Sequence, residues 1–101
     1  MVVELLPKVK ANLVLTHSED DDLLEGYIRS AIGYAEGYQK RNYKQEEMPV
    51  TTQQAVIMLS SHFYESRDGS TGGFFADYVG APKQVWDAVN RLLLMEKRWE
   101  V

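Results

Sequence analysis

The chain has 101 residues, 45% of them apolar, and a formal net charge of −4 at pH 7. This length predicts a single domain over residues 1–101. The absence of cysteine excludes disulfides and thiolate metal sites. The acidic balance argues against a broad basic surface that would bind the phosphates of a nucleic acid.

No apolar run approaches the roughly 18 residues that a membrane-spanning helix needs. The short apolar stretch at the N-terminus is interrupted by Glu4 and Pro7, which is not typical of a signal peptide. We therefore expect a soluble, intracellular protein without a membrane partner.

The first predicted helix is short and covers about residues 3–12. Its apolar face is built from leucine and valine: Leu5, Leu6, Val9 and Leu13. Pro7 is expected in the first turn, where the missing N–H costs nothing.

The second predicted helix covers about residues 19–40. Its apolar stripe recurs at steps of three and four: Leu24, Ile28, Ala31, Ala35 and Tyr38. Ser18 is expected to open the helix, and the acidic run at 19–22 to favour the positive end of its dipole. That run lacks the ligand spacing of an EF-hand calcium loop, so we interpret it as a helix start.

A second stripe of the same period consists of small residues: Gly26, Ser30, Gly33 and Gly37. Glycine inside a helix destabilises it by ~1 kcal/mol relative to alanine. Three glycines in register therefore suggest that another part of the protein or a partner packs against this flat face. Either another helix of the same domain packs closely there, or a neighbouring subunit does. We favour packing within the domain, because close backbone approach is the usual use of glycine.

The best-marked helix covers residues 51–67 and should be the central one, since it is apolar over most of its circumference. Thr51 is predicted as its N-cap, with Gln54 completing a capping box and Val50 as the staple residue. Arg67, near its end, is expected either to pair with a neighbouring helix or to reach across a subunit boundary.

A long loop at 69–81 precedes the last helix. Its first half is rich in glycine, and its second half carries Phe74, Phe75 and Tyr78. These aromatic residues should either fold back on the core or insert into a partner. The last helix covers about residues 82–98, with Trp86 on its broad apolar face, and Trp99 is expected to be a partly buried anchor. The fold class is therefore all-α: three main helices plus a short N-terminal one.

No constellation of catalytic or metal-binding residues stands out. His62 and Glu65 lie one turn apart, but a helix-bundle metal site needs such pairs from several helices, and the chain has no second one. A DNA-reading helix-turn-helix is excluded by the long connectors between the helices. We expect no enzyme activity, no cofactor and no metal.

Three blocks of the sequence resemble the head–tail connector family of tailed bacteriophages and prophages. These are VKANL at 9–13, then EDDDLL at 19–24 with YIRSA at 27–31 and AEGY at 35–38, and last QAVIML at 54–59 with HFYESR at 62–67. The last block is the most specific. The resemblance covers about residues 3–67 and does not extend to the aromatic loop or the tail.

The resemblance implies a structural protein without catalysis or a cofactor. Such subunits assemble as a ring, of dodecameric type, on the portal protein, extend the DNA channel and dock the next head-completion or tail protein. DNA would pass through without sequence-specific binding. The protein would lie in the virion at the head–tail junction, and in the host cytoplasm during assembly or as a prophage product.

From the residues themselves we predict a set of subunit or partner contacts, with the 69–81 loop and the last helix forming one surface. The set is Gly26, Gly33, Gly37, Arg67, Phe74, Phe75, Tyr78 and Trp86. The alternative function is a cellular helical binding module that clamps a protein or peptide with the aromatic loop.

Overall fold

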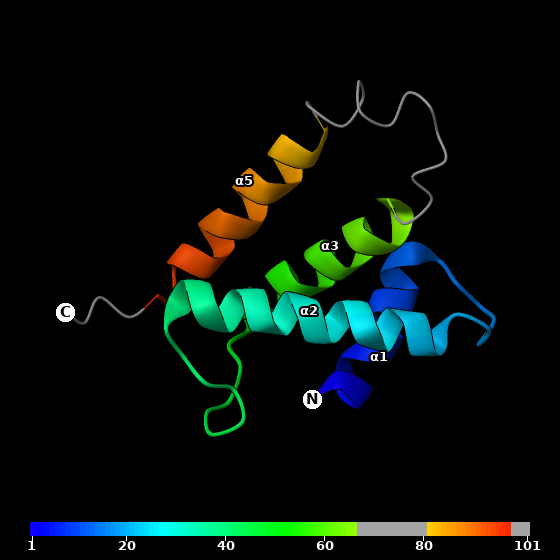
Figure 1. Ribbon diagram of the computed structural model, residues 1–101, viewed down its shortest axis with the longest axis horizontal. Coiled ribbons are helices and arrows are strands. Elements are labelled where there is room, and N and C mark those ends of the chain that lie inside the picture. The colour runs from blue at the N-terminus through cyan, green and yellow to red at the C-terminus, as the bar shows by residue number, and fades with distance from the viewer. Residues whose placement is uncertain (67–80, 98–101) are drawn as a thin grey trace.

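The computed structural model describes residues 1–66 and 81–97. All regular structure in this part is helical (Figure 1). The helices are α1 (Val2–Leu13), α2 (Asp21–Gln39), α3 (Val50–Ser66) and α5 (Ala81–Leu94). The predicted all-α fold, with three main helices and a short N-terminal one, is confirmed.

Helix α3 is the centre of the bundle and packs against α1, α2 and α5. Its buried residues lie around most of the helix: Thr52, Ala55, Val56, Ile57, Leu59, Ser60, Ser61 and Tyr64. The prediction of a central helix is confirmed. Figure 1 shows α1 and α5 on opposite sides of α3, with α2 lying across it.

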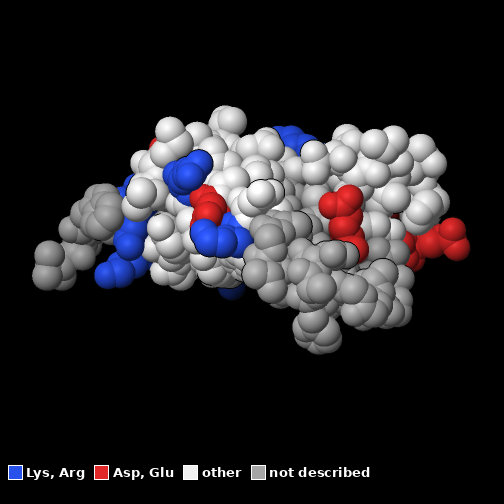
Figure 2. All heavy atoms as spheres, turned by 90° about the horizontal axis from the view of Figure 1, so that it is seen from above, with Lys and Arg blue, Asp and Glu red and all other residues white. Residues whose placement is uncertain are grey.

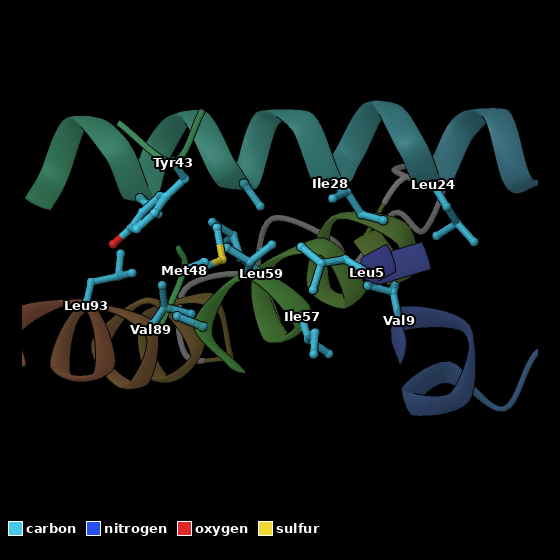
Figure 3. Close-up of a cluster of buried hydrophobic side chains, with 14 of the residues drawn as sticks. Leu5, Val9, Leu24, Ile28, Tyr43, Met48, Ile57, Leu59, Val89 and Leu93 are labelled. Atoms are coloured by element: carbon cyan, nitrogen blue, oxygen red, sulfur yellow. The ribbon is translucent and has the colours of Figure 1, made fainter. Parts of the chain in front are cut away.

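The core runs along the inner side of α2 (Figure 3). At one end, Leu24 and Ile28 of α2 lie near Leu5 and Val9 of α1. At the other end, the core contains Tyr43 and Met48 from the connector after α2, together with Val89 and Leu93 of α5. Each fully buried aliphatic side chain contributes about 1.5–3 kcal/mol.

The start of α3 differs from the prediction. The helix begins at Val50, whose side chain is 79% exposed and is therefore no staple residue. Thr51 Oγ1 has no hydrogen-bond partner within the described residues, so the predicted capping box is wrong. Instead, buried Met48 anchors the connector, and Gln53 Nε2 donates to its carbonyl at 3.0 Å. The apolar anchor is thus Met48, two residues before the helix, and the helix begins one residue earlier than predicted.

The position of Pro7 also differs from the prediction, because it lies in the second turn of α1. A proline there leaves the carbonyl of Val3 without its usual helix donor. Both residues are exposed, so water can bind that carbonyl. The flanking residues Leu5 and Val9 are buried and keep α1 on the core.

A buried polar contact ties three helices together. Gln39, the last residue of α2, is 0% exposed. Its Nε2 donates to Thr52 Oγ1 of α3 and to the Leu93 carbonyl of α5, each at 2.9 Å. Its Oε1 accepts from the Tyr43 hydroxyl. Because every group is satisfied, this network stabilises one arrangement of the helix ends.

Candidate subunit interface

The small-residue stripe of α2 lies on the outside of the molecule. Gly33 and Gly37 are exposed and Gly26 is half-buried. A Cβ built on any of these three glycines would meet no atom of the described residues within 4 Å. None of the described helices packs against this stripe, so the interpretation of close packing within the domain is wrong for residues 1–66 and 81–97.

The reason is the position of the apolar stripe on the same helix. Leu24, Ile28, Ala31 and Ala35 are buried and face α1 and α3. A helix turns about 100° per residue, so the stripe that contains Gly33 points away from those partners. What the glycines leave in this part of the chain is a flat, open helix face.

A shallow hollow borders this face between α1 and α2. Its volume is about 800 Å³. It is lined by apolar groups and by charges of both signs: Met1, Val2, Glu4, Arg29, Ile32, Gly33, Glu36, Tyr43 and Lys44. Burial raises the pKa of the Tyr43 phenol above its ordinary value. Because the hollow carries charges of both signs, it suits a protein surface that also carries both signs better than it suits a polyanion such as a nucleic acid.

Helix α5 has an outer face that carries charges in alternation. Lys83, Asp87 and Arg91 are exposed at one-turn intervals, and the exposed Met95 directly follows the last residue of the helix. Lys83 Nζ lies 3.0 Å from Asp87 Oδ2. In the view from above, where α5 lies nearest the viewer, an acidic group lies between two basic groups (Figure 2).

Trp86 lies on the other side of α5 and packs within the chain. Its ring meets the ring of Tyr34 edge-on at 4.9 Å between centroids and the ring of Phe63 at 6.3 Å. Tyr34 in turn donates to Asn90 Oδ1 at 2.6 Å, and burial raises its pKa above the ordinary value. The half-buried Trp86 therefore closes the seam between α5, α2 and α3.

Several predicted contact residues lie outside the described part of the chain. These are Arg67, Phe74, Phe75 and Tyr78, together with the expected anchor Trp99. Of the 69–81 loop only Ala81 is described, as the first residue of α5.

The surroundings of His62 are those of a helix residue. Its Nδ1 lies 3.5 Å from Ser66 Oγ, but the Ser66 hydroxyl donates to the His62 carbonyl of its own helix. Across residues 1–66 and 81–97, no group of three or more His, Cys, Asp or Glu is placed to hold a metal ion. None of the helices in that same part combines the length and apolar character needed to cross a bilayer.

Two ion pairs on the exposed faces were missed from the sequence. Arg29 lies 3.5 Å from Glu25 on α2, and Lys83 pairs with Asp87 on α5. Both are separated by four residues, a spacing that indicates neighbours on a helix and could have revealed them. Gln39 could not be found in this way, because a single glutamine carries no periodic signal.

A comparison with protein-family models finds a match over most of the chain. The family model described as phage gp6-like head-tail connector protein matches residues 4–92. The chain belongs to this family. The resemblance seen in the sequence is confirmed, and it extends beyond residue 67 into α5.

Membership assigns the connector a structural role at the phage head–tail junction, with other head or tail proteins as its partners. The virion is accordingly its place of action. No match to this connector was found among curated proteins or among solved structures.

Proposed function

We infer that this connector is the subunit of a ring beneath the portal, of dodecameric type, that extends the DNA channel and docks the next head-completion or tail protein. The single observation that carries this function is the family match over residues 4–92. The chain would be made in the host cytoplasm, from a phage or prophage genome, and would act as one domain.

The open faces of α2 and α5 support this function. A ring subunit needs two different surfaces, one for each neighbour. The glycine face of α2 and the charged face of α5 lie on different helices, and both are exposed within the described residues. Replacing each of these glycines by alanine would stabilise an isolated subunit by about 1 kcal/mol. The glycines are therefore better explained by a contact with a neighbouring subunit.

The charge supports passage of DNA without retention. A net charge of −4 gives the subunit no general attraction for the phosphate backbone. DNA would move along such a wall without sequence-specific contacts. The alternative, a cellular module with an aromatic clamp at 69–81, depends on residues that lie outside the described part except Ala81, and no observation favours it.

The test is complementation of phage heads that lack the protein. Heads made with the gene deleted should fail to join tails, and addition of the purified chain should restore joining. Electron microscopy of the treated heads should show added ring density below the portal. Normal tail joining without the gene, or no binding of the chain to such heads, would overturn the proposed function.

A further inference from the structure

We propose that the glycine face of α2 on one subunit binds the charged outer face of α5 on the next subunit, with the two helices parallel. The glycine face is defined here as Gly26, Arg29, Gly33 and Gly37, with Glu25 at its edge. The α5 face is defined as Gln84, Asp87 and Arg91, with Lys83 at its edge and Met95 directly after the end of the helix. The pairing rests on the proposed function, because it takes self-assembly of the connector as given.

The spacing of the two faces agrees residue for residue. The four positions of the glycine face follow one another at steps of three, four and four, and so do the three positions of the α5 face together with Met95. Aligning Arg29 with Asp87 brings Gly33 opposite Arg91 and Gly37 opposite Met95. The large side chains of α5 then lie over glycines, where no atom of the described residues is within 4 Å of the missing Cβ. Helices approach most closely where one of them carries small residues.

The charges of the two faces are complementary in the same alignment. On α2 the acid precedes the base, with Glu25 one turn before Arg29, whereas on α5 the base precedes the acid, with Lys83 one turn before Asp87. In the parallel arrangement Glu25 therefore faces Lys83 while Arg29 faces Asp87. The two intrahelical pairs would join into a four-charge network, and such complementarity fixes partner and register.

An antiparallel arrangement of the same two helices would make fewer favourable contacts between the same residues. With Arg29 still against Asp87, an antiparallel α5 places Arg91 against Glu25 and Lys83 over Gly33. Met95 then leaves Gly37 and moves toward the acidic start of α2. The charges alone permit the antiparallel direction. We favour the parallel direction because only there do large side chains of the neighbouring subunit cover both exposed glycines, Gly33 and Gly37.

Two double-cysteine variants of the full chain separate the directions. The chain has no cysteine of its own, so any disulfide comes from the introduced pair. Gly33→Cys with Arg91→Cys should form an intermolecular disulfide ladder on mild oxidation, because a disulfide needs Cα atoms within about 7 Å. The matched control, Gly33→Cys with Lys83→Cys, shares one site and also loses one α5 cation. Its sites lie two turns, about 12 Å, apart in the parallel register, and it should form no disulfide ladder.

Charge exchange tests the same contact without cysteines. Glu25→Lys with Arg29→Glu reverses the α2 pair, and Lys83→Glu with Asp87→Lys reverses the α5 pair, both at unchanged net charge. Each variant alone should need about tenfold or more protein for half-maximal assembly. An equimolar mixture of the two should assemble as well as the wild type, because each reversed face then meets a reversed partner.

The outcomes separate the pairing from the proposed function. Three results would overturn the parallel pairing without contradicting the proposed ring. These are a ladder from the Lys83 control alone, equal ladders from both cysteine variants, and no ladder under conditions where the wild type assembles. Failure of the mixed charge variants to recover overturns the pairing as well. A wild-type chain that stays monomeric both in solution and on heads lacking it overturns the proposed function and the pairing with it.

Discussion

Gln39 and Thr52 are joined where three helices meet: Nε2 of Gln39 donates to Oγ1 of Thr52 at 2.9 Å, and the same nitrogen donates to the Leu93 carbonyl. Both side chains are 0% exposed. The ends of α2 and α5 and the start of α3 are therefore held by one amide group. Because α2 and α5 carry the two faces of the proposed subunit contact, this amide also sets the angle between those faces.

Replacing Gln39 by leucine should destabilise the fold by about 3 kcal/mol. The apolar side chain would remove three buried hydrogen bonds, which the Gln39 amide makes with the Leu93 carbonyl, the Thr52 hydroxyl and the Tyr43 hydroxyl. Urea unfolding followed by circular dichroism measures the loss. The matched control, Gln54→Leu, changes an exposed glutamine of α3 and should stay within about 0.5 kcal/mol of the wild type. Equal losses for both variants would contradict a special role for the Gln39 network.

Removing the Trp86 ring should destabilise the chain by about 2–3 kcal/mol, because Trp86→Ala empties the seam lined by Tyr34 and Phe63. Trp86→Phe keeps an aromatic ring there and should lose much less. Thermal unfolding measures both. If Trp86→Ala instead leaves the melting temperature unchanged and weakens assembly, the residue belongs to a subunit contact.

Alanine at an exposed glycine of α2 should stabilise the isolated subunit. Gly33→Ala and Gly37→Ala should each add up to about 1 kcal/mol, because alanine loses less backbone entropy in a helix and its methyl group enters open space. Ser30→Ala, on the same side of the helix, should gain less, since serine is a better helix former than glycine. Calorimetry of the monomer measures the shift. A lower melting temperature for both glycine variants would show that this face is covered within the subunit.

The stability of the chain should fall at alkaline pH. Burial raises the pKa of Tyr34 and Tyr43 in the folded state above the unfolded value of about 10. Above that pH the unfolded chain releases these protons first, so the contribution present below about pH 10 is lost as the pH rises through the folded pKa values. Urea unfolding at a series of pH values should show this decline.

The control for this decline is a chain with both phenols removed. Tyr34→Phe with Tyr43→Phe should be less stable than the wild type at neutral pH, because Asn90 and Gln39 lose their donors. Above pH 10, however, its free energy of unfolding should depend less steeply on pH. An unchanged slope would assign the decline to other groups.

Much of the architecture could be read from the sequence because it depends on helical period. The stripe beginning at Leu24 and the apolar circumference of the central helix each predict a helix and its buried side, since only a 3.6-residue repeat brings such positions together. The phage connector resemblance was also visible in the sequence, in the blocks that end with HFYESR at 62–67. Period and composition were thus sufficient for the fold class, and the resemblance of these blocks was sufficient for the family.

The environment of particular residues depended on the tertiary structure. Tyr43 and Met48 lie in a polar connector without periodicity, yet both are buried, because the connector crosses the end of the core. The glycines of α2 posed the opposite problem. A glycine stripe is equally compatible with close helix packing and with an open face, and only the placement of α1, α3 and α5 on the far side of α2 shows that Gly33 and Gly37 are left uncovered within the described chain.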